Sequence, residues 1–185
     1  RRVFVNSMSD LFHERIPESF IDSVFNTMQS AWWHEFQVLT KRPERMADYA
    51  QRRTRRSGPL SDTHPNVWLG TSVESQRYVF RGHLVAALSS SVRFLSCEPL
   101  LGPLDLSPLL GAKSVNWVIV GGESGPHART MDASWVRDIR DQCRSARVAF
   151  FFKQWGGPRK STTGRVLDRR MWNEMPVGVA AKART

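Results

Sequence analysis

Polar residues that could bind or transform a ligand follow each of six short apolar segments of this sequence. Carboxylates and lysines are prominent among them, and such groups act as acids and bases or hold charged ligands. We predict three catalytic residues, Glu98, Glu123 and Lys153. The predicted cofactor-binding residues are Glu74, Gly121, Gly122 and Ser124, and the predicted substrate-binding residues are Asn6, Asp10, Lys41, Arg42 and Gln154. Any one of these residues is equally consistent with a helix cap or a turn, but the set indicates a shared site.

The most specific local pattern is the run Gly121-Gly122-Glu123-Ser124-Gly125-Pro126. Glycines at a strand end allow close approach of the backbone and leave N–H groups that can cradle an anion. The run matches neither common nucleotide-binding glycine pattern, and a plain tight turn is the alternative interpretation. Glu98 precedes Pro99, which favours an extended Glu98 whose carboxylate projects from the strand end.

The two cysteines, Cys97 and Cys143, are far apart and outside any Cys-x-x-Cys or Cys/His spacing. This arrangement favours neither a disulfide framework nor a zinc site, and it predicts reduced thiols in a cytoplasmic protein. Cys97 could be a nucleophile, but a packed thiol is the favoured interpretation because no histidine is close to it in the sequence. The five histidines show no metal-ligand spacing, so no metal-binding residue is predicted.

The elements that must position these residues are the six apolar segments, each followed by a polar loop and a helix or room for one. Most are apolar on both faces, as is typical of buried parallel strands. They occupy residues 3–5, 36–39, 67–70, 92–95, 117–120 and 148–152. An amphipathic helix is predicted from Pro17, and another before the last strand, around Val136 and Ile139. The predicted fold class is α/β with parallel (βα) repeats, either a barrel or an open doubly wound sheet.

The composition predicts one domain over residues 1–185, with residues 156–185 as a C-terminal extension. The formal net charge of +10 favours polyanionic partners. The candidate nucleic-acid contacts are Arg52, Arg53, Arg55 and Arg56, although a solvated helix face is the commoner meaning of such a cluster. No run of eighteen apolar residues occurs, so no membrane span is predicted.

Six strings of residues, in this order, resemble one known family. They are Phe4-Val5-Asn6-Ser7-Met8-Ser9-Asp10-Leu11-Phe12-His13, Leu39-Thr40-Lys41-Arg42-Pro43-Glu44-Arg45-Met46, Asn66-Val67-Trp68-Leu69-Gly70, Arg93-Phe94-Leu95-Ser96-Cys97-Glu98-Pro99-Leu100-Leu101-Gly102-Pro103, Val118-Ile119-Val120-Gly121-Gly122-Glu123-Ser124-Gly125 and Phe151-Phe152-Lys153-Gln154-Trp155-Gly156. The sequence resembles the phage-protein family known as gp-thirty-seven/gp-sixty-eight, long described as a domain of unknown function. The resemblance runs from residue 1 to about residue 176.

This resemblance implies that a full-length member carries a further N-terminal portion with two strands and three clustered cysteines. That layout is similar to radical S-adenosylmethionine enzymes, in which three thiolates hold a [4Fe–4S] cluster. The chain is therefore expected to hold six strands of a TIM-barrel-like fold, as an incomplete barrel. It lacks the cysteine triad, so no cofactor is expected in this chain alone, and S-adenosylmethionine and the cluster are expected only in the full-length protein. The loop from Gly121 to Ser124 would face the amino-acid moiety, and Glu98 or Glu74 the ribose or ammonium group.

Two function classes are left open by the sequence. The first is the C-terminal portion of a radical S-adenosylmethionine-like enzyme, inactive alone because the cluster-binding cysteines are absent. The second is a basic nucleic-acid-binding module of phage or mobile-element origin. A degenerate remnant with no activity is a further interpretation, outside these two classes. An open six-stranded sheet would also leave two unpaired edges, at residues 3–5 and 148–152. Such edges predict self-association or poor solubility, unless a further segment closes the sheet.

Overall fold

A six-stranded parallel sheet forms the centre of the molecule in a computed structural model, which describes residues 1–6, 8–159 and 163–176. The strands are β1 (Arg2–Val5), β2 (Glu35–Thr40), β3 (Val67–Ser72), β4 (Val92–Cys97), β5 (Trp117–Gly121) and β6 (Ala149–Gln154). Their order in the sheet equals their order in the chain, β1-β2-β3-β4-β5-β6. A doubly wound sheet would reverse direction at a switch point, so this order selects the barrel-like alternative. The predicted fold class, an incomplete TIM-barrel-like α/β fold, is confirmed.

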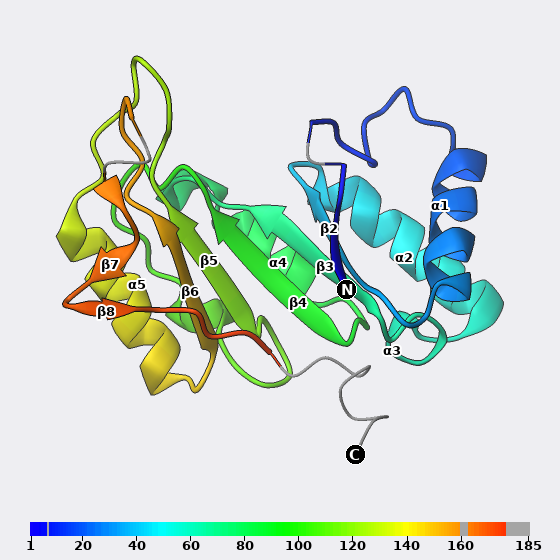
Figure 1. Cartoon of the computed structure of the whole chain (residues 1–185). Helices are drawn as coiled ribbons and strands as arrows, with labels where there is room; N and C mark the ends of the chain where they lie inside the picture. Colours follow the sequence, from blue (N-terminus) through cyan, green and yellow to red (C-terminus); the bar gives the residue numbers. More distant parts are fainter. Residues whose placement is uncertain (7, 160–162, 177–185) are drawn as a thin grey trace.

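The helices cover the outer side of the curled sheet (Figure 1). They are α1 (Glu18–Ser30), α2 (Pro43–Ser57), α3 (Leu60–Thr63), α4 (Phe80–Ala86) and α5 (Ala133–Ser145), with 3₁₀ turns at Gln76–Tyr78 and Ser107–Leu109. The predicted amphipathic helix is α1, which starts after Pro17 and buries Ile21, Phe25 and Met28. Within the described ranges, the helices are too short or too polar to cross a lipid bilayer.

The inner face of the sheet is lined by aromatic rings, because alternate strand residues point to opposite faces. The Trp117 ring centroid lies 5.7 Å from that of Trp68, 5.5 Å from that of Phe94 and 6.2 Å from that of Phe151. A Cβ atom at Gly70 would lie 2.5 Å from the Phe94 ring, so the glycine makes room for this ring. These rings fill the inside of the half-barrel below the carboxyl ends of the strands.

The C-terminal segment closes one edge of the sheet. A small hairpin, β7 (Val166–Leu167) and β8 (Arg170–Met171), leads into residues 172–174, which run along β6. There the Phe152 amide donates to the Trp172 carbonyl (2.9 Å), and the Glu174 amide donates to the Phe150 carbonyl (3.1 Å). The sequence predicted an open edge at β6. This prediction was wrong, because residues 172–174 of the C-terminal extension pair with that edge. Residues 160–162 and 177–185 of the extension lie outside the described residues.

The same segment also crosses the base of the inner face. Trp117 donates its indole N–H to the Glu174 carbonyl (3.0 Å), and Met175 packs against the inner aromatic cluster. Arg2 lies over the Trp68 ring at 5.8 Å and donates to the Met175 sulfur. The amino ends of the strands are thus covered, and the polar loops lie at the opposite ends.

Candidate functional site

Two cations meet a buried carboxylate after β3. Glu74 lies beyond the end of β3, and its side chain is only 8% exposed. Its Oε1 lies 2.7 Å from Lys41 Nζ, and its Oε2 lies 3.2 Å from an Arg81 guanidinium nitrogen. Arg81 also donates to the Ser72 carbonyl and stacks over the Tyr78 ring at 4.0 Å. Two predicted residues, Lys41 and Glu74, are therefore in contact, and the head of Lys41 is accessible because its side chain is 58% exposed.

A second ion pair spans β5. Glu98 follows β4, Lys153 belongs to β6, and Lys153 Nζ lies 2.7 Å from Glu98 Oε2. Gly121 lies between them, and a Cβ atom there would lie 3.2–3.4 Å from the Glu98 side chain. The glycine therefore lets the Glu98 side chain lie across β5 and reach the next strand. Lys153 is about half exposed (54%), so this pair is accessible to a ligand.

Asp10 ties the loop after β1 to the loop after β2. Its carboxylate accepts hydrogen bonds from the Thr40 hydroxyl (2.7 Å), the Phe12 and Lys41 amides and Arg42 Nη1 (3.0 Å). Burial acts to raise the pKa of this carboxyl, but the hydrogen bonds outweigh it and the pKa lies below the usual value. Asp10 and Arg42 are both predicted to bind substrate, but their charges pair with each other. In this structure the pair holds two loops together.

Asn6 lies at the end of β1 in a left-handed conformation with φ of 60°, which asparagine tolerates better than most residues. Its carbonyl accepts a hydrogen bond from the Ser9 amide at 3.3 Å. The backbone at Asn6 therefore turns the chain out of the sheet.

The glycine loop after β5 packs closely against the chain after β6. A Cβ atom at Gly122 would lie 1.9 Å from the Trp155 carbonyl oxygen. The Gly122 amide donates to the Gln154 carbonyl (2.9 Å), and Gln154 Nε2 donates to the Ser124 hydroxyl (2.9 Å). Two predicted residues, Gln154 and Ser124, are therefore in contact. The glycines allow this close approach of two backbones, and the Gly122 amide is used in it.

Glu123 turns toward Arg129 in its own loop. The guanidinium donates to both carboxylate oxygens, at 2.7 and 2.9 Å, and the Arg129 amide adds a third bond. The Arg129 hydrogen bonds lower the pKa of Glu123 to about 2. A carboxylate held this way is a poor proton acceptor at neutral pH, so the geometry favours Glu98 over Glu123 as a reactive carboxylate.

Both cysteines are buried on the helix-covered side of the sheet, where Cys97 and Cys143 belong to one apolar cluster. Burial raises the pKa of the Cys97 thiol well above its usual value, and burial together with the Glu174 charge raises that of Cys143 to about 12. Such thiols are unreactive, which fits the packed-thiol interpretation. Among the described residues, no group of three His, Cys, Asp or Glu side chains could hold a metal ion.

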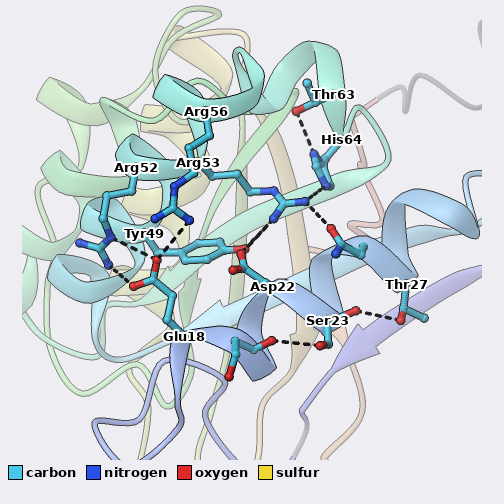
Figure 2. Close-up of polar contacts among 12 residues, drawn as sticks. Glu18, Asp22, Ser23, Thr27, Tyr49, Arg52, Arg53, Arg56, Thr63 and His64 are labelled. Atoms are coloured by element: carbon cyan, nitrogen blue, oxygen red, sulfur yellow. Dashed lines mark hydrogen bonds and ion pairs between the residues drawn. The ribbon is translucent and has the colours of Figure 1, made fainter.

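The arginine cluster of α2 faces α1, as Figure 2 shows. Arg52 contacts Glu18 with two hydrogen bonds (2.9 and 3.3 Å), and Arg56 lies 3.9 Å from the same carboxylate. Arg53 Nη1 donates to Asp22 at 3.0 Å, and the Arg53 side chain is only 12% exposed. Three of the four arginines predicted to contact nucleic acid therefore bind acidic residues of the same molecule.

Sequence reasoning missed Arg81 and Arg129, which bind two of the predicted carboxylates. Each arginine follows its carboxylate closely in the sequence: Arg81, on α4, comes seven residues after Glu74, and Arg129 comes six after Glu123. This proximity in sequence was the available signal. It is weak, because an exposed arginine at that distance is common in any charged loop.

The fold and the site define a parallel α/β half-barrel protein whose polar residues gather at the carboxyl ends of the strands. The chain belongs to a family described as protein of unknown function (DUF5131), whose profile matches residues 1–176. No curated protein and no solved structure matches it. The family description names no activity.

Proposed function

We propose that the carboxyl ends of the strands bind S-adenosylmethionine or a related amino-acid-bearing ligand, as the ligand-holding part of a radical S-adenosylmethionine-like enzyme. The observation that supports this most is the Glu98–Lys153 pair, held across Gly121 with the lysine half exposed. An α-amino acid end carries both an ammonium and a carboxylate. A site that offers both a carboxylate and a cation can exchange its own ion pair for two pairs with such a ligand.

The two parts of the expected cofactor fit this chain differently. The [4Fe–4S] cluster does not fit, because the two cysteines are buried thiols and cannot supply three ligands. S-adenosylmethionine fits, because Lys41 and Lys153 offer accessible cations beside Glu74 and Glu98. The ligand supplies radical chemistry only with a reduced cluster, so this chain by itself would bind it without reaction.

The residues would share the work of binding. Lys153 would hold the ligand carboxylate and Glu98 the ammonium group, since these are the charges each can pair with. Glu74 would act through Lys41, because the carboxylate is buried and Arg81 already occupies its second oxygen. We further propose a cytoplasmic location, which agrees with two free, buried thiols.

Calorimetric titration with S-adenosylhomocysteine, an unreactive analogue, tests this proposal. The expected result is binding in which Glu98→Gln and Lys153→Met each raise the Kd at least about tenfold, since a charge-assisted hydrogen bond is lost. Lys113→Met and Asp138→Asn are matched controls, exposed charges elsewhere on the molecule, and should leave the Kd within about twofold. Equal affinity for all five proteins, or no heat at millimolar ligand, would refute it.

The alternative proposal, a nucleic-acid-binding module, is supported by the net charge of +10. The internal ion pairs of Arg52 and Arg53 weigh against the α2 face as its binding surface. Fluorescence anisotropy with labelled single-stranded DNA over a range of salt concentrations separates the two. Affinity that falls steeply with salt and is lost in Arg52→Ala with Arg53→Ala would favour this alternative.

A further inference from the structure

Four charged side chains form a row along the carboxyl ends of the strands. In strand order they are Lys41 after β2, Glu74 after β3, Glu98 after β4 and Lys153 on β6, so the two carboxylates lie between the two lysines. The lysine side chains are 58% and 54% exposed, whereas the carboxylate side chains are 8% and 18% exposed. The groups that a ligand can reach most easily are therefore the two cations.

Both lysines belong to the face of the sheet that carries the aromatic rings. Lys153 lies two residues after Phe151, and Lys41, directly after β2, lies two residues after Leu39. Phe151 and Leu39 both pack against the inner aromatic cluster. Side chains two residues apart lie on the same face of a strand. The two cations therefore belong to one site rather than to opposite sides of the sheet.

The charges of this row do not cancel. Glu98 pairs with Lys153, one charge with one charge. Glu74 has two cationic partners, because Lys41 Nζ lies 2.7 Å from its Oε1 and an Arg81 guanidinium nitrogen lies 3.2 Å from its Oε2. The Arg81 side chain is only 14% exposed, so the surplus positive charge is accessible at Lys41.

Lys41 has hydrogen-bonding capacity beyond its contact with Glu74. An ammonium group carries three N–H donors, and within residues 1–6, 8–159 and 163–176 the ion pair of Lys41 is with Glu74 alone. The alternative interpretation is an ion pair that only neutralises Glu74. Arg81 by itself already supplies one positive charge to that carboxylate, so neutrality does not require the lysine.

We propose that Lys41 binds the oxyanion of a second ligand, a substrate that carries a phosphate or carboxylate group and lies beside the amino-acid-bearing ligand. This inference rests on the proposed function, which pairs Lys153 and Glu98 with the first ligand and leaves Lys41 without a ligand group. An α-amino acid end has no net charge, and the sulfonium group of S-adenosylmethionine adds a positive one. The first ligand therefore does not neutralise the surplus, and the second ligand supplies the negative charge.

Titration with inorganic phosphate, followed through the backbone amide chemical shifts at constant ionic strength, tests this site. The expected result is saturable shifts at Lys41 and its neighbours with a Kd of about 1–10 mM. Lys41→Met should raise this Kd at least about tenfold, because a charge-assisted hydrogen bond is lost. The variant should remain folded, since the side chain is more than half exposed.

Two further variants serve as controls. Lys41→Arg keeps the positive charge and should hold the phosphate Kd within about threefold of the parent value. Lys113→Met removes an exposed lysine elsewhere and should leave the Kd within about twofold. Shifts that do not saturate, or a Kd that is the same in Lys41→Met and the parent chain, would overturn the proposal.

A parallel titration with acetate identifies the source of the oxyanion. A phosphate Kd at least about tenfold below the acetate Kd would indicate a phosphate ester, and comparable values would indicate a carboxylate. Calorimetry with S-adenosylhomocysteine keeps the two proposals separate. Phosphate binding at Lys41 without binding of this analogue would refute the proposed function and leave the oxyanion site standing. Binding of the analogue without phosphate binding would overturn the oxyanion site alone.

Discussion

Lys153 Nζ lies 2.7 Å from Glu98 Oε2, although Glu98 follows β4, Lys153 belongs to β6, and β5 lies between these strands. A side chain on β5 at the same level would stand between them. Gly121 occupies that position, and its missing side chain is what brings the two charges together. The contact therefore depends on three consecutive strands, and each can be tested separately.

Gly121→Ala is expected to weaken ligand binding more than it weakens folding. The new Cβ atom would lie 3.2–3.4 Å from the flexible Glu98 side chain, which can move by a few tenths of an ångström. We expect the free energy of unfolding to change by less than about 1 kcal/mol, and the Kd for S-adenosylhomocysteine to rise severalfold. Urea denaturation and calorimetry measure the two quantities. Gly102→Ala is the control, since a Cβ atom there meets nothing within 4 Å, and an unchanged Kd in Gly121→Ala would contradict the assigned role.

Gly122→Ala, one residue further, is expected to act on folding. Its Cβ atom would lie 1.9 Å from the Trp155 carbonyl oxygen, and backbone cannot move aside as a flexible side chain can. Overpacking of this kind costs about 1–3 kcal/mol or more, so we expect a lower urea midpoint or an insoluble protein. A variant as stable as the parent chain would show that the loops after β5 and β6 can move apart without lowering the free energy of unfolding.

The sequence predicted the parallel strands because their two-sided apolarity is a local property of each segment. It also predicted polar residues directly after the strands, since this too is a local property of each segment. Glu98 and Lys153 could not be paired from the sequence, because their contact depends on the curl of the sheet and on the space above Gly121. The curl is a collective property of six strands.

The role of residues 172–176 was also beyond sequence reasoning. Their segment contains little periodicity, and its pairing with β6 depends on the β7–β8 hairpin, which turns at Asp168 and Arg169 with positive φ angles of 50° and 61°.

The α2 arginines were misleading for a related reason. A basic run in a sequence does not reveal that Glu18 and Asp22 on the neighbouring helix face it.

Arg53→Ala is expected to destabilise the protein by about 1–3 kcal/mol, because it removes the partner of several half-buried groups. Arg53 donates to Asp22 (3.0 Å) and Asn26 (2.7 Å), and it also contacts His64. Arg55→Ala, two residues away on the exposed side of α2, is the control and should change the free energy of unfolding by less than about 0.5 kcal/mol. Chemical denaturation at pH 7 measures both. Equal stabilities would mean that the cluster does not hold α2 against α1.

His64 is expected to make the protein less stable below pH 6.5. The residue is 1% exposed, its Nε2 lies 3.2 Å from Arg53 Nη2, and its Nδ1 lies 2.9 Å from the Thr63 hydroxyl. Burial, with a smaller contribution from the Arg53 charge, lowers the pKa of His64 to about 4, against about 6.5 in an unfolded chain. The folded state therefore prefers the neutral ring, and the unfolded state binds the proton first as the pH falls.

The sign and size of the effect follow from that difference. The stabilisation from His64 is complete above pH 6.5 and is lost as the pH falls toward 4, at a cost of about 1.5 kcal/mol between pH 6.5 and 5. Carboxylates with lowered pKa values, such as Asp10, lose their contribution at lower pH, outside the interval from 6.5 to 5, and comparison with a His64 variant isolates this histidine from the other four. Urea denaturation of the parent chain and of His64→Gln across this interval is the measurement. The parent should lose about 1.5 kcal/mol more than the variant, and parallel pH profiles would mean that His64 is protonated as readily in the folded protein as in the unfolded chain.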